Sequence, residues 1–207
     1  GLGWVLGETL ISGIGQGYFQ TTPIQLCLMM AQLANGGHEI KARIIDDKDK
    51  LQTVINNWRE KFNSSSDKIF GFSNIKKLYR NQENIKFVLD ALYGATNEPM
   101  GTSYRSRLTQ SEYMFAGKTG TSQIRRITAE ERELNLKQKD LPYERRDHAL
   151  FIAFAPYKNP RYAFSVVVEH GGSGSSGAAP IAKRVIKKVL ERHKIRKKYQ
   201  LDLFQET

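Results

Sequence analysis

"FAGKTGTSQI", residues 115–124, predicts a β-strand with an unusual surface. Successive side chains of a strand point to opposite faces, so Lys118 and Gly120 face one way while Thr119 and Thr121 face the other. One face therefore carries a cation beside bare backbone, and the other carries two hydroxyl groups. A strand with a purely structural role has no need of this surface, which makes the segment our first candidate for a functional site.

Two apolar segments that follow predict the sheet to which this strand belongs. "HALFIAFAP", residues 148–156, and "RYAFSVVVEH", residues 161–170, are separated by a short turn and read as a β-hairpin whose strands are central or covered. A weaker pattern, "HEIKARII" at residues 38–45, indicates a further short strand. The sequence therefore predicts an antiparallel sheet.

Three segments predict helices. The first begins with Thr22 as N-cap and Pro23 at the first helical position, and it stops at the Asn-Gly-Gly of residues 35–37. "ENIKFVLDALYGAT", residues 83–96, places Ile85, Val88, Leu89 and Leu92 on one helical face, with Gly94 at the stop. The third is an amphipathic helix in which Ile181, Val185, Ile186, Val189 and Leu190 form the apolar side. Helices packed on an antiparallel sheet define an α/β fold of the α+β type.

Three further segments separate or extend these elements. Residues 125–147 are rich in charges of both signs and read as an exposed insertion. "GGSGSSGAAP", residues 171–180, reads as a flexible connector. The tail at about residues 192–207 is basic, and we expect its cations to meet either solvent or anionic lipid.

The composition of the 207 residues fits one globular unit. The hydrophobic fraction is 40%, and the net charge of +11 suits nucleic acid, an anionic membrane surface, an acidic substrate or simply a solvated basic surface. No segment approaches the roughly 18 apolar residues of a membrane span. Because the chain begins "GLGWVLGETL", without a methionine, we expect it to be a piece of a longer protein.

Several other patterns in the sequence do not indicate a functional site. The single cysteine, Cys27, excludes an internal disulfide and reads as a core-facing thiol. The glycines at 13, 15 and 17 lack the last glycine of a dinucleotide-binding loop, because Tyr18 follows them. The histidines do not have metal-site spacing, and we expect structural or solvent-facing roles for them: His38, His148, His170 and His193. We therefore expect no metal and no cofactor.

Lys118-Thr119-Gly120 matches the K-T-G element of serine enzymes that also carry S-x-x-K and an S-D-N-type triplet. The lysine lowers the cost of moving a proton at a nearby serine, and the glycine lets a ligand lie against the strand. Hydroxyl groups suit a substrate carboxylate, and the backbone N–H of Thr121 suits an oxyanion. The alternative is an ordinary strand with an exposed lysine.

The order of five motifs resembles that of class B penicillin-binding proteins, particularly the transpeptidases of cell elongation. The motifs are "GIGQGYFQTTPIQL", "DALYGATNEPMGTSYRS", "FAGKTGTSQ", "RRDHALFIAFAPYKNPRYAFSVVVEHGG" and the closing helix. The resemblance extends to about Arg192. It implies the penicillin-binding transpeptidase fold, with residues 1–207 as the C-terminal part of the domain.

The resemblance implies a serine-type peptidoglycan D,D-transpeptidase. The serine attacks the penultimate D-alanine carbonyl of a stem peptide, a neighbouring amine resolves the acyl-enzyme, and β-lactams imitate the substrate. Lys118 and Thr121 would be catalytic, and Thr119, Gly120 and Thr121 would bind substrate. The implied partners are stem peptides, β-lactams and elongation-machinery membrane proteins including a glycosyltransferase, with no nucleic acid. The implied location is the bacterial inner membrane, with the catalytic domain in the periplasm.

The nucleophile is the main departure from the family pattern. Strings of the S-x-x-K type begin at Ser65 and Ser73, and Tyr79-Arg80-Asn81 spells a Y-x-N triplet. All of them follow the glycine loop, whereas the family places its nucleophile well before it, so we interpret them as chance matches and expect the chain alone to be inactive. A catalytically silent module that binds peptidoglycan or a β-lactam, and a D,D-carboxypeptidase, remain as alternatives.

Overall fold

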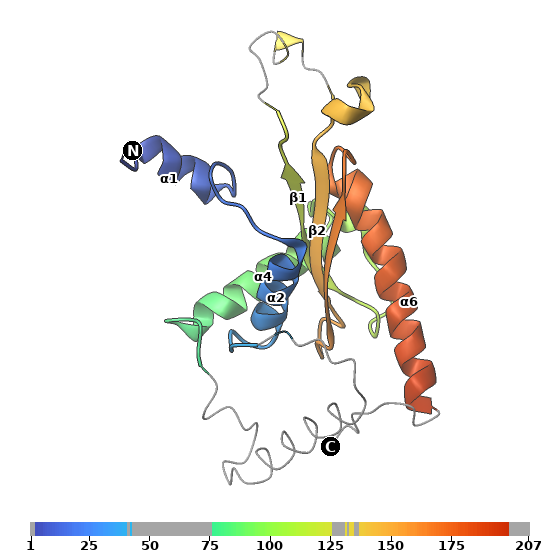
Figure 1. Ribbon diagram of the computed structural model, residues 1–207. Helices are drawn as coiled ribbons and strands as arrows, with labels where there is room; N and C mark the ends of the chain where they lie inside the picture. Colours follow the sequence, from blue (N-terminus) through green and yellow to red (C-terminus); the bar gives the residue numbers. More distant parts are fainter. Residues whose placement is uncertain are drawn as a thin grey trace, which may run out of the picture.

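A computed structural model describes residues 3–40, 42, 76–125, 131, 133, 134 and 137–198 (Figure 1). The helices are α1 (Leu6–Gly13), α2 (Pro23–Ala34), α4 (Gln82–Asn97) and α6 (Ala179–Lys198), and the strands are β1 (Ala116–Ser122), β2 (His148–Ala155) and β3 (Tyr162–Val168). Short turns of helix are η1 (Tyr104–Ser106), η2 (Gln138–Asp140), η3 (Tyr143–Arg145) and η4 (Gly174–Ala178). The strands form an antiparallel sheet in the order β1-β2-β3, so the predicted fold class and hairpin are confirmed.

The sheet carries one apolar cluster on each face. On one face Phe115 and Phe151 meet edge to face, with ring centroids 6.1 Å apart, and Ile186 of α6 is fully buried with them. On the other face Met30 of α2 and Leu92 of α4 pack with Phe154. Alternation along β2 sends Phe151 to the first cluster and Phe154 to the second. The helices α2 and α4 thus cover the face opposite to α6 (Figure 1).

Helix α2 begins and ends where its sequence predicts. The Thr22 hydroxyl accepts a hydrogen bond from Gln25 N at 3.3 Å, and the Gln25 side-chain oxygen accepts one from Thr22 N at 2.8 Å. This reciprocal pair satisfies two backbone donors of the first turn, and Pro23 lacks the donor that would otherwise need a partner. The helix ends at Ala34, before the Asn-Gly-Gly stop.

Other boundaries correct the sequence-based predictions. Residues 6–13 form α1, a helix that the sequence analysis did not predict. Gly94 lies inside α4, which continues to Asn97, and Val88 is partly exposed rather than packed. In the predicted strand 38–45 the described residues make one isolated bridge, from His38 to Lys77, and the rest lies outside the described residues.

The segment predicted to be a flexible connector is closely packed. Residues 174–178 form the turn η4 that leads directly into α6, and Gly174 and Ala178 are buried. Along α6, Ile186 and Leu190 are buried and Val189 is partly buried, whereas Val185 is 43% exposed. The small residues of this segment therefore permit close approach rather than mobility.

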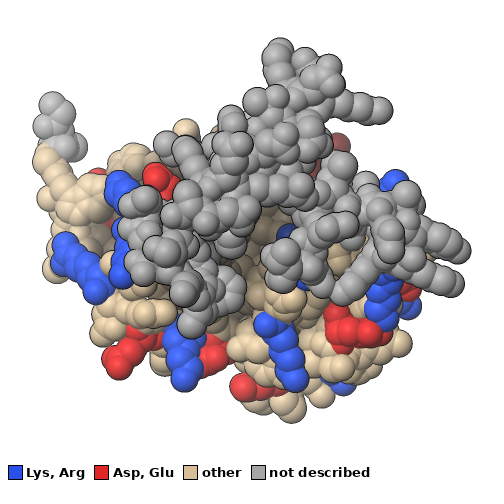
Figure 2. Space-filling model, turned by 90° about the horizontal axis from the view of Figure 1, so that it is seen from below, with Lys and Arg blue, Asp and Glu red and all other residues tan. Residues whose placement is uncertain are grey.

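The charged segment 125–147 is exposed only in part. Leu141 and Asp147 are buried, and Arg125 and Glu131 form a largely covered ion pair. The expectation of a wholly exposed insertion is therefore wrong at both ends of the segment. On the face seen in Figure 2, basic and acidic side chains of the described residues are interspersed rather than gathered by sign. Within the described ranges, the helices are all too short or too polar to cross a membrane.

Candidate active site on an edge strand

The backbone of β1 has one edge paired with β2 and one edge facing outward. Backbone groups of successive residues in an antiparallel strand point alternately to the two sides. The carbonyl oxygens of Phe115 and Gly117 accept hydrogen bonds from α4, so they point away from β2. By the same alternation, the N–H and C=O groups of Thr119 and Thr121 also point outward. The Thr121 N–H therefore points away from β2, and its role toward an oxyanion stays a prediction.

Two side chains of α4 close the first part of this outer edge. Thr96 Oγ1 donates to Gly117 O at 3.2 Å, and Asn97 Nδ2 donates to Phe115 O at 2.9 Å. Thr96 is buried and also lies 3.2 Å from Ser103 Oγ. The helix end thus covers the outer edge as far as Gly117 and, within the described residues, does not extend over Thr119 and Thr121.

The side chains of the motif are divided between the two faces as predicted. Lys118 is paired with Ile152 and Gly120 with Leu150, whereas Thr119 is paired with Phe151, which belongs to the opposite face. Lys118 is exposed, and its Nζ donates to Thr119 O at 2.9 Å. The Thr119 hydroxyl lies 3.0 Å from that of Thr102, which follows α4. The Lys118 cation and the Thr119 hydroxyl, 3.5 Å apart, therefore meet at the outer edge of the strand.

Gly120 lies beneath the turn η4. A Cβ atom on Gly174 would lie 2.4 Å from Gly120 O and 2.5 Å from Leu150 O, so only glycine allows the turn to reach the strand backbone. A Cβ atom on Gly120 itself would meet only the Leu150 side chain, at 3.4 Å. The close contact therefore explains why position 174 is a glycine, and it sets the distance between η4 and the strand backbone.

Three residues of the site were missed by the sequence analysis. Thr96 and Thr102 bind β1 from the segment that includes "GATNEPMGTS", and Asp147 accepts a hydrogen bond from Ile124 N just beyond the strand. A sequence signal exists only for Asp147, an acidic residue directly before an apolar strand. The two threonines have no such signal, because their role depends on contacts 17 and 21 residues apart along the chain.

Cys27 and the histidines have the structural surroundings that were expected. The Cys27 thiol donates to Ala163 O at 3.4 Å, and burial raises its pKa above that of a free cysteine. His148 Nδ1 accepts from His170 N, His193 Nδ1 lies 2.8 Å from the Tyr162 hydroxyl, and His38 Nδ1 lies 3.1 Å from Asn35 O. In the part of the chain that the structure describes, His, Cys, Asp and Glu side chains do not gather into a metal-binding group.

For one of the chance matches to other catalytic motifs, the Tyr79-Arg80-Asn81 triplet, the structure shows a local structural role. Asn81 is the N-cap of α4, since its Oδ1 accepts from Glu83 N at 2.9 Å. Tyr79 of the same Y-x-N triplet lies edge to face with His38. Ser65 and Ser73 lie outside the described residues.

The sheet, its helices and the K-T-G edge define a transpeptidase domain of the penicillin-binding type. The chain belongs to the family described as "Penicillin binding protein transpeptidase domain", which matches residues 2–187. It is 33% identical over 187 residues to the peptidoglycan D,D-transpeptidase MrdA of Salmonella typhimurium, covering 88% of this chain and 27% of that protein. The chain therefore spans about a quarter of the length of such curated relatives.

Solved structures agree with this assignment. Penicillin-binding protein 2 of Pseudomonas aeruginosa, in complex with WCK 5153, is 36% identical with a TM-score of 0.59, covering 88% of this chain and 32% of that one. The complex of penicillin-binding protein 2 with MreC from Helicobacter pylori has a TM-score of 0.63 at 26% identity, covering 91% and 28%.

Proposed function

We propose that this chain is the C-terminal part of a peptidoglycan D,D-transpeptidase domain and that it supplies the third motif of a split active site. The serine nucleophile then comes from a part of the protein that precedes Gly1. The carrying observation is the open outer edge of β1, where Lys118 and the Thr119 and Thr121 backbones meet. The 33% identity to MrdA, a peptidoglycan D,D-transpeptidase, supports the choice of reaction.

The reaction gives each residue of the edge a task. The serine hydroxyl attacks the penultimate D-alanine carbonyl of a stem peptide, and the terminal D-alanine leaves. Lys118 provides a cation that eases proton movement at the serine. The Thr121 N–H donates to the developing oxyanion, and removal of one such donor typically costs about 3 kcal/mol of transition-state stabilisation. An amine of a neighbouring stem peptide then resolves the acyl-enzyme.

The Thr119 and Thr121 hydroxyl groups bind the terminal carboxylate of the substrate. Both are short side chains next to a lysine, so a carboxylate gains a positive charge and neutral donors together. Gly120 keeps the position next to Lys118, on the face opposite to the two threonines, free of a side chain. β-Lactams imitate the same D-Ala-D-Ala end and would be held by the same groups.

The proposed partners and location follow from the relatives. The complex of a related penicillin-binding protein 2 with MreC supports a membrane partner of the elongation machinery, alongside a glycosyltransferase. The catalytic domain would lie in the periplasm, attached to the inner membrane by a part of the protein outside this chain.

The test is acylation of the complete protein by a fluorescent penicillin. Lys118→Ala should slow labelling by roughly 100-fold or more, since positioned proton transfer contributes that much. Lys118→Arg keeps the charge but should also lose most activity, because a guanidinium remains protonated and is bulkier. Lys158→Ala, an exposed lysine beyond β2, is the matched control and should label normally. Labelling of the Lys118→Ala variant at the normal rate would contradict the proposed role.

Intact-mass spectrometry of the 207-residue chain tests the split site separately. Incubation with benzylpenicillin should leave the mass of the chain unchanged, whereas the complete protein should gain one adduct. An adduct on Ser73 or Ser65 would place the nucleophile inside the chain and overturn this part of the proposal.

A further inference from the structure

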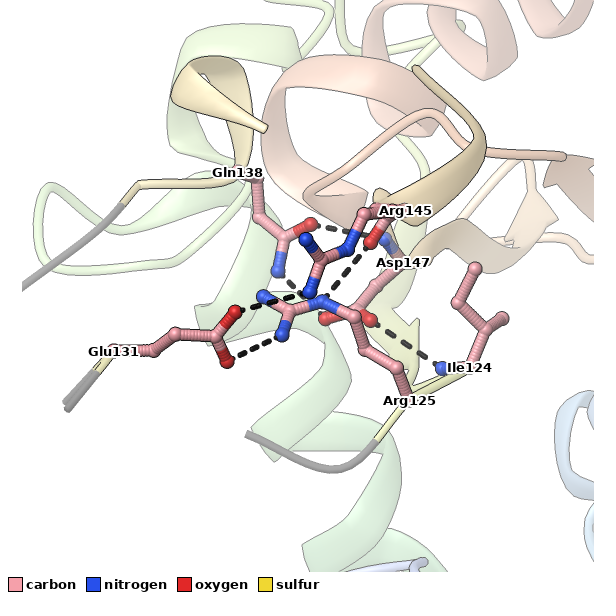
Figure 3. Close-up of polar contacts among 6 residues, drawn as sticks. All are labelled: Ile124, Arg125, Glu131, Gln138, Arg145 and Asp147. Carbon is pink, nitrogen blue, oxygen red and sulfur yellow. Dashed lines mark hydrogen bonds and ion pairs between the residues drawn. The ribbon is translucent and has the colours of Figure 1, made fainter. Parts of the chain in front are cut away.

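A buried carboxylate lies just beyond the K-T-G strand. Asp147 is 3% exposed, and its two side-chain oxygens accept from different donors: Oδ1 from Ile124 N at 3.3 Å and Oδ2 from Gln138 Nε2 at 2.6 Å. The Asp147 N–H in turn donates to Gln138 Oε1 at 2.9 Å. Figure 3 shows the aspartate and the glutamine facing one another, with Ile124 on the other side of the carboxylate. All the hydrogen-bonding groups of this contact are matched donor to acceptor.

The carboxylate is close to the residues of the proposed site. Ile124 follows Thr121 by three residues, which corresponds to roughly 10 Å of extended chain. Asp147 O also accepts from Gly172 N at 2.8 Å, two residues before the glycine that lies on the Gly120 backbone. Asp147 therefore joins the end of β1 to the segment that leads into η4, the turn that packs on the same strand.

Ion pairs and a hydrogen bond hold Arg125, the residue next to Ile124, in place. Arg125 Nη1 lies 2.5 Å from Glu131 Oε2, and Arg145 Nη2 lies 3.2 Å from Glu131 Oε1. Arg125 Nε also donates to Arg145 O at 3.2 Å. The Arg125 and Glu131 side chains are only 17% and 15% exposed, so water screens their pairing less than that of a surface pair. The chain leaving β1 is thus held at two successive residues (Figure 3).

We infer that Asp147 is a positioning residue for the transpeptidase reaction. Its carboxylate, oriented by Gln138, fixes the end of β1 so that the Thr121 N–H points at the oxyanion. A carboxylate suits this task because it accepts from two donors at once, whereas an asparagine would turn its NH₂ group toward one of them. The inference rests on the proposed function, since it concerns the geometry of the same strand.

A reciprocal exchange tests the inference in the complete protein. Asp147→Asn places an amide NH₂ against either Ile124 N or Gln138 Nε2, and Gln138→Glu places a carboxylate against the Asp147 carboxylate. The double variant restores every contact: the new carboxylate at position 138 accepts from both the side-chain and the backbone nitrogen of residue 147, and the side-chain oxygen of residue 147 accepts from Ile124 N. The exchange also keeps the net charge. Glu144→Gln, an exposed carboxylate three residues away, is the matched control.

The measurement separates the rate of acylation from the amount of active protein. Benzylpenicillin labelling gives the first-order acylation rate constant at saturation and, from its end point, the fraction of protein that reacts. Each single variant should lose roughly tenfold in the rate constant at a full end point, because small misplacements of reacting groups are costly. The double variant should recover most of this loss, and Glu144→Gln should match the unmodified protein.

Other outcomes would overturn the inference or the proposed function. Single variants that acylate at the normal rate, or that show a reduced end point with an unchanged rate constant, would make Asp147 a stabilising residue only. A double variant as slow as the single variants would exclude the hydrogen-bond pattern as the cause. If neither single variant yields folded protein, the double variant decides: a normal rate supports the inference, and a slow rate overturns it. Failure of the unmodified protein to acylate would instead overturn the proposed function.

Discussion

Two regions of the molecule differ in how much of their apolar surface is buried. One is the sheet with α6 packed on it, and the other is helix α1. In the first region Phe115, Phe151 and Ile186 are completely buried together. In the second, none of the residues of α1 is buried, and Leu6 and Leu10 are 76% and 68% exposed. The ribbon of α1 accordingly extends away from the sheet (Figure 1).

This difference in burial indicates which interactions stabilise each region. Burial of an aromatic or aliphatic side chain contributes about 1.5 to 3 kcal/mol, so the sheet and α6 stabilise one another. Among the described residues, the support of helix α1 is local: Glu8 Oε2 accepts from Val5 N at 2.8 Å, and Trp4 Nε1 donates to the Thr9 hydroxyl at 2.8 Å. A helix of eight residues without packing is marginal in water. Mutations in the two regions should therefore have very different effects.

Gly174→Ala in the first region should give the largest effect. The new Cβ atom would lie 2.4 Å from a backbone oxygen of β1, and backbone cannot yield as a side-chain tip can, so we expect a loss of at least about 3 kcal/mol in the free energy of unfolding. Gly7→Ala in α1 is the matched control, since a Cβ atom there has no neighbour within 4 Å. It should favour α1 locally by up to about 1 kcal/mol and leave the unfolding of the sheet unchanged.

Urea unfolding of the 207-residue chain, followed by circular dichroism, measures both variants. An unchanged midpoint for Gly174→Ala would show that η4 can leave the strand without cost. A large shift for Gly7→Ala would show that α1 is coupled to the sheet.

Ile186→Ala should give the next largest effect. Removing this fully buried side chain leaves a cavity beneath the sheet, and we expect a loss of about 3 kcal/mol. Val185→Ala changes the neighbouring residue of α6, which is 43% exposed, and should stay within about 0.5 kcal/mol. Thermal unfolding of the two variants compares the faces of one helix, and equal shifts would contradict the packing described above.

Thr22→Ala should have a smaller effect, because it removes one helix cap rather than core packing. The loss should be about 1 kcal/mol, since the hydroxyl accepts from Gln25 N and α2 contributes the buried Met30 to the second cluster. Thr21→Ala, the preceding threonine, does not remove the cap and is the control. The same denaturant titration checks both, and equal losses for the two variants would exclude the cap as the cause.

The smallest expected effect concerns the rate at which the Cys27 thiol is alkylated. Burial raises the pKa of its thiol, so the reactive thiolate is scarcer than at a free cysteine at the same pH. Alkylation by iodoacetamide at about pH 8 should therefore be slower than for the chain unfolded in urea. A faster reaction in the folded chain would indicate an activated thiol and contradict its structural role.

Local features of the sequence predicted much of this architecture. Thr22 and Pro23 predicted the start of α2, and the alternation in residues 116–122 predicted which motif side chains share a face. These features depend on neighbours a few residues apart. The roles of Lys118 and Thr121 remain predictions, since they depend on a substrate and a nucleophile.

Features that depend on distant contacts could not be predicted. Gly94 lies in the interior of α4 rather than at its end, because the helix continues until Thr96 and Asn97 reach β1. Residues 171–180 have the composition of a linker, yet Gly174 lies on a strand more than 50 residues earlier in the chain. Glycine has the same composition signal in a mobile segment and in a close contact, and only the fold distinguishes them.

The hydrogen bonds from α4 to Phe115 and Gly117 also have a consequence for association between molecules. An uncovered strand edge is a template on which a strand of another chain can pair, and such pairing begins aggregation. Because Thr96 and Asn97 already occupy the outer carbonyl groups of the first part of β1, a foreign strand cannot extend along that part of the edge. Among the described residues, the part of the β1 edge beyond this cover runs only from Thr119 to Ser122, which limits such pairing to a few residues.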